Sequence, residues 1–109
     1  IILTTATAQV EAISYEDSTS AIDTINEKLR GWHCTPLKIE YVGSSAEDLE
    51  YLNSLKRGKF TDCMVFKSDF HTPRAEDNQT TFEPDTDYKD WTWYFGLNGD
   101  KWELVTYGY

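Results

Sequence analysis

The amino-acid sequence predicts an α+β domain, in which a curved antiparallel sheet packs on one main helix and a short second helix accompanies it. Three observations predict this class. The last twenty residues read as two aromatic strands joined at Asn98-Gly99, which is the strongest short-range signal for a β-hairpin. One segment in the first third has the apolar spacing of a helix, and several others alternate apolar and polar residues as strands do. At 109 residues, the chain suits a single domain over residues 1–109 with one core.

The first expected elements are a strand and the main helix. Residues 6–15 alternate and favour a strand, although Val10 and Ile13 could also lie on a short helix. Asp17-Ser18-Thr19-Ser20 then offers side chains that cap helix N-termini, and the helix is expected to run to about Arg30. The apolar stripe of this helix consists of Ile22, Ile25, Leu29 and Trp32.

A second strand and the short helix follow. Gly31 is expected to end the main helix, and residues 35–42 alternate as a strand does. The apolar face of that strand is expected to hold Leu37, Ile39 and Tyr41. Ser45 with Asp48 resembles a capping box, so a short helix is expected to start there and to end at Gly58.

The last elements are a strand, a long loop and the aromatic hairpin. Residues 60–70 alternate, whereas residues 72–88 are polar, contain two prolines and show no periodicity, which is typical of a long loop. A two-residue turn at Asn98-Gly99 sets the register of the hairpin and leaves Tyr107 on the face opposite the tryptophans. The expected cross-strand pairs are Phe95 with Trp102 and Trp93 with Leu104. This order of elements is the one expected of a cystatin-like roll.

The net charge of −9 excludes some classes of partner. Nucleic acids and anionic membrane surfaces attract basic patches, so we expect this acidic chain to bind no nucleic acid. No run approaches ~20 apolar residues, and we expect no direct membrane insertion of the domain. The sequence has no Gly-rich phosphate loop and no nucleophile motif. We therefore assign no catalytic residues and expect no cofactors.

Four segments resemble a known family. They are Cys34–Gly43, Asp62–His71, Tyr88–Tyr94 and Trp102–Tyr109. Together they resemble a family of small extracytoplasmic lipoprotein domains of unknown function from Gram-positive gut bacteria. The resemblance implies a bacterial protein that is secreted or anchored in the cell envelope, and it implies no catalytic residues. A chain that starts at Ile1 instead of Met agrees with a mature or trimmed form.

Asp69 and His71 are the main candidates for chemistry. They lie two residues apart at the end of a predicted strand, so both side chains should point to the same side. A carboxylate can orient a histidine for acid–base or metal chemistry, whereas the simpler interpretation is a polar cluster at a strand end. His33 is the only other histidine that could join a zinc site. The segment Asp85–Asp90 resembles the start of a calcium loop, but it lacks the glycine at the sixth position of such a loop and the glutamate at the twelfth. We therefore expect no metal site.

The leading functional hypothesis is a binding module for an unknown extracellular ligand or protein. The residues expected to bind it flank the long loop or lie near the chain end. They are Asp69, His71, Trp91 and Tyr107. The acidic residues of the loop favour a cationic or hydroxyl-rich ligand. The alternative is a small enzyme in which Asp69 and His71 act as acid and base in a pocket between helix and sheet, and a third hypothesis is a structural or regulatory part of a larger protein.

Cys34 and Cys63 are expected to be free thiols. If their strands are antiparallel neighbours, the two residues lie about seven positions out of register, or roughly 23 Å apart. A disulfide requires Cα atoms within ~7 Å of each other. Bridging these cysteines would therefore require a different order of strands.

Overall fold

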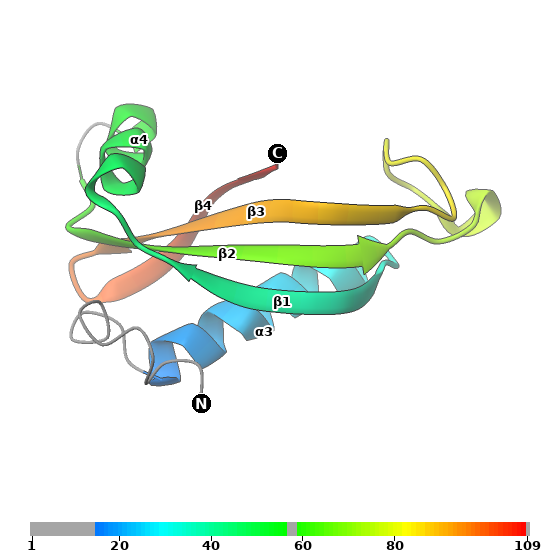
Figure 1. Ribbon diagram of the computed structural model, residues 1–109, viewed down its shortest axis with the longest axis horizontal. Coiled ribbons are helices and arrows are strands. Elements are labelled where there is room, and N and C mark those ends of the chain that lie inside the picture. The colour runs from blue at the N-terminus through cyan, green and yellow to red at the C-terminus, as the bar shows by residue number, and fades with distance from the viewer. Residues whose placement is uncertain (1–14, 57–58, 109) are drawn as a thin grey trace.

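The computed structural model describes residues 15–56 and 59–108 (Figure 1). The elements in chain order are α3 (Tyr15–Gly31), β1 (Thr35–Gly43), α4 (Ala46–Lys56), β2 (Asp62–His71), the 3-10 helix η1 (Ala75–Asp77), β3 (Asp87–Asn98) and β4 (Lys101–Gly108). Two helices and a four-stranded antiparallel sheet confirm the predicted α+β class. The strand expected over residues 6–15 lies outside the described residues except for Tyr15, which belongs to α3.

The sheet has the simple strand order β1-β2-β3-β4, with every neighbouring pair antiparallel. The helix α3 runs along one face of the sheet, and α4 lies at one end of the other face (Figure 1). Two separate groups of buried side chains correspond to these two contacts. The sheet is therefore the middle layer, and α4 covers only one end of its outer face.

The main core lies between α3 and the sheet, as the apolar stripe of the helix predicted. Ile25 and Leu29 are fully buried there, while Ile22 and Trp32 pack at its margin. The sheet contributes Met64, Phe66, Phe70, Trp93 and Phe95. The largest of these side chains is that of Trp93, whose indole N–H donates a 2.8 Å hydrogen bond to Ser68 Oγ. Because this buried polar atom has a partner, the tryptophan can lie in the core without an unsatisfied donor.

Only the N-terminal end of α3 differs from the prediction. The helix begins at Tyr15, so the expected capping residues at 17–20 lie inside its first turn and a half. It ends at Gly31, as expected, and closes in a Schellman motif, in which the Cys34 N–H donates to Leu29 O and the His33 N–H donates to Arg30 O. His33 occupies the left-handed position at φ +60°, which usually belongs to glycine.

The strand β1 carries two bulges that the alternating pattern did not predict. Its pairing with β2 slips at Leu37 and again at Val42, so neither residue has a cross-strand partner. Ile39 and Tyr41 pack against the core as expected, but Leu37 is 52% exposed. The prediction that Leu37 shares their apolar face is therefore wrong.

The hairpin is confirmed, but its register is not the predicted one. The turn is Gly99-Asp100, with Gly99 at φ +67° in the first central position. Phe95 therefore lies opposite Leu104 instead of Trp102. A bulge at Val105 then places Tyr107, instead of Leu104, opposite Trp93. The sequence Asn-Gly-Asp contains two overlapping turn signals, and the pattern alone did not distinguish them.

The helix α4 closes a small second core on the outer face of the sheet. Its N-terminus has the predicted cap, in which the Asp48 N–H donates to Ser45 Oγ at 3.1 Å. The buried Leu52 meets Phe60 and Cys63 there. The Phe60 ring lies directly over Gly96, where an added Cβ would come within 2.5 Å of it.

Both cysteines are free and buried, which confirms that they are not bonded to each other. They belong to different cores, Cys34 under α3 and Cys63 under α4. Burial raises the pKa of the Cys63 thiol to about 11, so the reactive thiolate is suppressed at neutral pH.

Candidate functional site

His71, the last residue of β2, is held between two carboxylates. Its Nδ1 lies 2.6 Å from Asp87 Oδ1, and its Nε2 lies 2.8 Å from Asp85 Oδ1. Asp87 is the cross-strand partner of His71 at the start of β3. Asp85 reaches the ring from the end of the loop, where its backbone is left-handed at φ +49°. With an acceptor at each ring nitrogen, the doubly protonated imidazolium is the form that satisfies both hydrogen bonds.

The two aspartates raise the pKa of His71, and the hydrogen bond to Asp87 is the larger cause. A group with a raised pKa in the folded state stabilises that state while it is protonated. This stabilisation is complete below the pKa that a histidine has in the unfolded chain, ~6.5. It is lost as the pH rises through the higher pKa of His71 in the folded protein. The ring is exposed, so solvent weakens the interaction.

We expect His71→Gln to destabilise the protein at about pH 5.5 and to have little effect at about pH 9. Urea titrations of both proteins at several pH values measure this difference. In a background carrying Asp85→Asn and Asp87→Asn, the same exchange should lose its pH dependence. A stability difference that is constant from acidic to alkaline pH would contradict the assignment.

Asp69 has a structural contact of its own and does not orient His71. A bulge places Lys89 and Asp90 of β3 opposite Asp69 of β2. Asp90 adopts φ +58°, and its N–H donates a 2.9 Å hydrogen bond to Asp69 Oδ1. Lys89 Nζ lies 4.0 Å from the other carboxylate oxygen. The predicted Asp69–His71 couple is thus not formed, because Asp69 accepts a backbone N–H that the bulge displaces from the ladder.

Side-chain hydrogen bonds that were not predicted from the sequence hold the loop between β2 and β3 together. The buried Thr72 hydroxyl donates to Glu83 O at 2.6 Å and accepts the Thr86 N–H at 2.8 Å, which joins the two ends of the loop. Asn78 accepts the Thr80 N–H and donates to Phe82 O. The Asn-x-Thr sequence is a recognisable turn signal of this kind, but nothing local shows that Phe82 belongs to the core margin.

Phe82 anchors the loop to the aromatic residues under α3. Its ring centroid lies 4.9 Å from that of Tyr88, 5.2 Å from Trp91 and 5.4 Å from Trp32. These contacts hold the middle of the predicted long loop against the sheet. Aromatic pairs at such distances add about 0.5–1.5 kcal/mol each beyond the buried area.

Two of the predicted ligand-binding residues, Trp91 and Tyr107, come together on the α3 face. The Tyr107 ring is 6.4 Å from that of Trp91 and 5.4 Å from that of Trp32. It also packs 5.2 Å from the buried Trp93, yet the residue is 40% exposed. Lys28 Nζ lies 5.8 Å from the Tyr107 centroid. We call Trp32, Trp91 and Tyr107 the aromatic patch.

An open groove adjoins the aromatic patch. Its volume is about 370 Å³, and it is lined by Thr24, Glu27, Lys28, Gly31 and Trp32. The groove therefore offers a hydroxyl, a carboxylate and an ammonium group beside an aromatic ring. Of these residues, Trp32 was predicted to belong to the apolar stripe of the helix and Gly31 to end it. Their position beside Tyr107 was not predicted, because it depends on the hairpin bulge.

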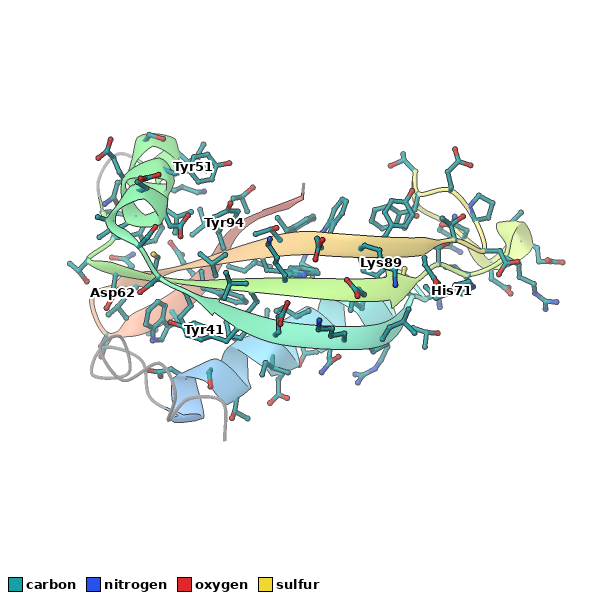
Figure 2. The ribbon with its side chains drawn as sticks, in the orientation of Figure 1. Tyr41, Tyr51, Asp62, His71, Lys89 and Tyr94 are labelled. Atoms are coloured by element: carbon teal, nitrogen blue, oxygen red, sulfur yellow. The ribbon has the colours of Figure 1, made fainter. Side chains whose placement is uncertain are left out.

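The other two predicted residues lie elsewhere. Asp69 is flanked in β2 by Ser68 and Phe70, which are buried on the α3 side, so its own side chain lies on the outer face. His71 lies with Lys89 at the loop end of the sheet, far along the strands from the Tyr51 and Tyr94 pair beside α4 (Figure 2). The four predicted residues thus do not form one site: Trp91 and Tyr107 lie together, whereas Asp69 and His71 each have other partners.

Neither a cluster of metal-ligating side chains nor a membrane-spanning helix is found among the described residues. Within residues 15–56 and 59–108, no three His, Cys, Asp or Glu side chains are grouped to hold a metal ion. Neither α3 nor α4 has the length and the hydropathy of a transmembrane helix. Comparisons with protein-family models, curated proteins and solved structures found no match to this chain.

Proposed function

We propose that this domain is an extracytoplasmic binding module of a bacterial envelope, and that its aromatic patch takes a hydroxyl-rich ligand such as an oligosaccharide. The observation that carries the proposal is the Tyr107 ring, which is 40% exposed although Trp32, Trp91 and Trp93 fix its position. A rigid, exposed ring offers contact area at a low cost in conformational entropy.

The chemistry around the patch supports this class of ligand. The C–H faces of a sugar ring pack well on aromatic rings, and its hydroxyls need nearby donors and acceptors. Thr24, Glu27 and Lys28 line the adjoining groove and can supply both. The net charge of −9 disfavours an anionic ligand.

The proposal also includes an extracytoplasmic location and a cystatin-like form of the α+β fold. The resemblance of four sequence segments to extracytoplasmic lipoprotein domains supports a secreted or envelope-anchored protein. A four-stranded antiparallel sheet with one long helix along its face supports the cystatin-like roll. The enzyme alternative depends on an Asp69–His71 couple, whereas Asp69 instead accepts the Asp90 N–H.

Oligosaccharide titrations followed by tryptophan fluorescence test the proposal. We expect a saturable change with at least one of the chito-, cello-, malto- and xylo-oligosaccharide series. Tyr107→Ser should weaken that binding by about tenfold, since an aromatic contact of this size contributes on the order of 1.4 kcal/mol.

The matched control is Tyr51→Ser. Tyr51 is similarly exposed, at 45%, but it lies on α4 at the outer face of the sheet. Its replacement should leave the binding unchanged. The proposal fails if none of the four series binds, or if Tyr107→Ser and Tyr51→Ser have equal effects.

A further inference from the structure

The strand β1 forms one edge of the sheet, because β2 is its only partner among the described strands. An edge strand presents unpaired backbone N–H and C=O groups to any neighbouring chain. Leu37 and Val42, at 52% and 51%, are the most exposed large hydrophobic side chains of the described residues. Both belong to this strand, and both are the bulged residues without a partner in β2.

The regular stretch between the two bulges carries one charge of each sign. Lys38 and Glu40 are two residues apart, so their side chains share a face of the strand. Lys38 Nζ lies 3.7 Å from Glu40 Oε1, with the side chains 60% and 46% exposed. An exposed pair of this kind contributes little to the stability of the monomer. Both side chains are therefore available to a second chain.

We propose that the edge of β1 away from β2 pairs antiparallel with the same edge of a second copy of this chain, with the two-fold axis at Ile39. Lys38 then lies opposite Glu40 of the second copy, and Glu40 lies opposite Lys38 of the second copy. Opposite residues of antiparallel strands have Cβ atoms about 4.5–5.5 Å apart, so both ion pairs can form. An axis at Lys38 or at Glu40 would place like charges opposite each other, which is destabilising.

The same register brings the two bulged residues, Leu37 and Val42, into the contact between the two copies. It places Leu37 opposite Tyr41 of the second copy and Val42 opposite Pro36 of the second copy. Pro36 cannot donate a backbone hydrogen bond, so pairing ends at that residue on each side. Because the contact is symmetric, it closes on itself and gives a dimer instead of an open fibre. The dimer joins two four-stranded sheets into one, and it does not depend on the proposed ligand.

Charge reversal tests the dimer and its register. Sedimentation equilibrium of the 109-residue chain should show a monomer–dimer equilibrium. Lys38→Glu and Glu40→Lys, each alone, should raise the dissociation constant at least about tenfold, because each single change creates two like-charge pairs. The double variant Lys38→Glu, Glu40→Lys should return to the wild-type value. An equimolar mixture of the two single variants should form the mixed dimer.

The Glu40→Lys variant is the decisive one. It lowers the net negative charge of the chain, so dimerisation at any other acidic surface would become stronger, whereas the proposed register requires it to become weaker. Lys101→Glu and Glu50→Lys are the charge-matched controls at exposed positions outside β1, and they should leave the dissociation constant near wild type. Thermal unfolding should show that all variants fold. A wild-type chain that is monomeric at about 0.5 mM, or single variants that dimerise normally, would overturn the proposal.

Discussion

Replacing Trp93 by alanine is expected to lower the free energy of unfolding by about 3–5 kcal/mol. The side chain has no exposed surface, and its ring packs 5.2 Å from Tyr107 and 5.9 Å from Trp32. Its removal leaves a cavity that the α3 core cannot fill, and it also leaves the buried Ser68 hydroxyl without its 2.8 Å partner. Urea titration followed by circular dichroism measures the loss.

Two further variants separate the causes of that loss. Trp93→Phe keeps much of the ring but removes the hydrogen bond to Ser68, so it should cost less than Trp93→Ala. Trp102→Ala removes an indole that lies only at the margin of the core and should cost less as well. If Trp93→Ala costs under about 1 kcal/mol, this face of the hairpin is not the core.

The second large effect is expected at Gly96. An added Cβ would come within 2.5 Å of the buried Phe60 ring, so Gly96→Ala should destabilise the protein by about 1–3 kcal/mol through overpacking. The φ of Gly96 is not in the left-handed region, so backbone conformation contributes no penalty. The same urea titration measures the change.

A double-mutant cycle identifies the source of the Gly96 effect. In a Phe60→Ala background the clash is absent, and Gly96→Ala should become neutral or stabilising. Gly31→Ala is the control, since nothing lies within 4 Å of its added Cβ. Equal losses for Gly96→Ala with and without the Phe60 ring would refute the steric explanation.

The candidate site was only partly predictable from the sequence. Alternation correctly indicated that Asp69 and His71 lie at a strand end, but their partners come from β3 and the loop, 14 to 21 residues away in sequence. Asp69 accepts the Asp90 N–H because of a bulge in the pairing of β2 with β3. No residue pattern within either strand predicts that bulge. Tyr107 was expected to bind the ligand from the face opposite the tryptophans. It lies beside Trp91 because Val105 is an extra residue in β4.

The type and order of most elements were predictable from sequence patterns alone. Periodicity identified α3, β1, α4, β2 and the hairpin, because burial of one face imposes a period of 3.6 or 2 on the residues of each element. The helix cap at Ser45 was also predictable, because its partner Asp48 is only three residues away in the sequence. The periodicity and the cap both depend on residues that are close together in the sequence, so a pattern within one segment is enough to predict them.

The registers and the bulges, in contrast, depend on how the strands pack together. The choice of Gly99-Asp100 over Asn98-Gly99 as the turn places Phe95 opposite Leu104, and this choice depends on how the hairpin packs against α3. The bulges at Leu37, Asp90 and Val105 likewise follow from fitting one strand to its neighbours. A register is a property of two segments and of what they cover, so a pattern within one segment cannot determine it.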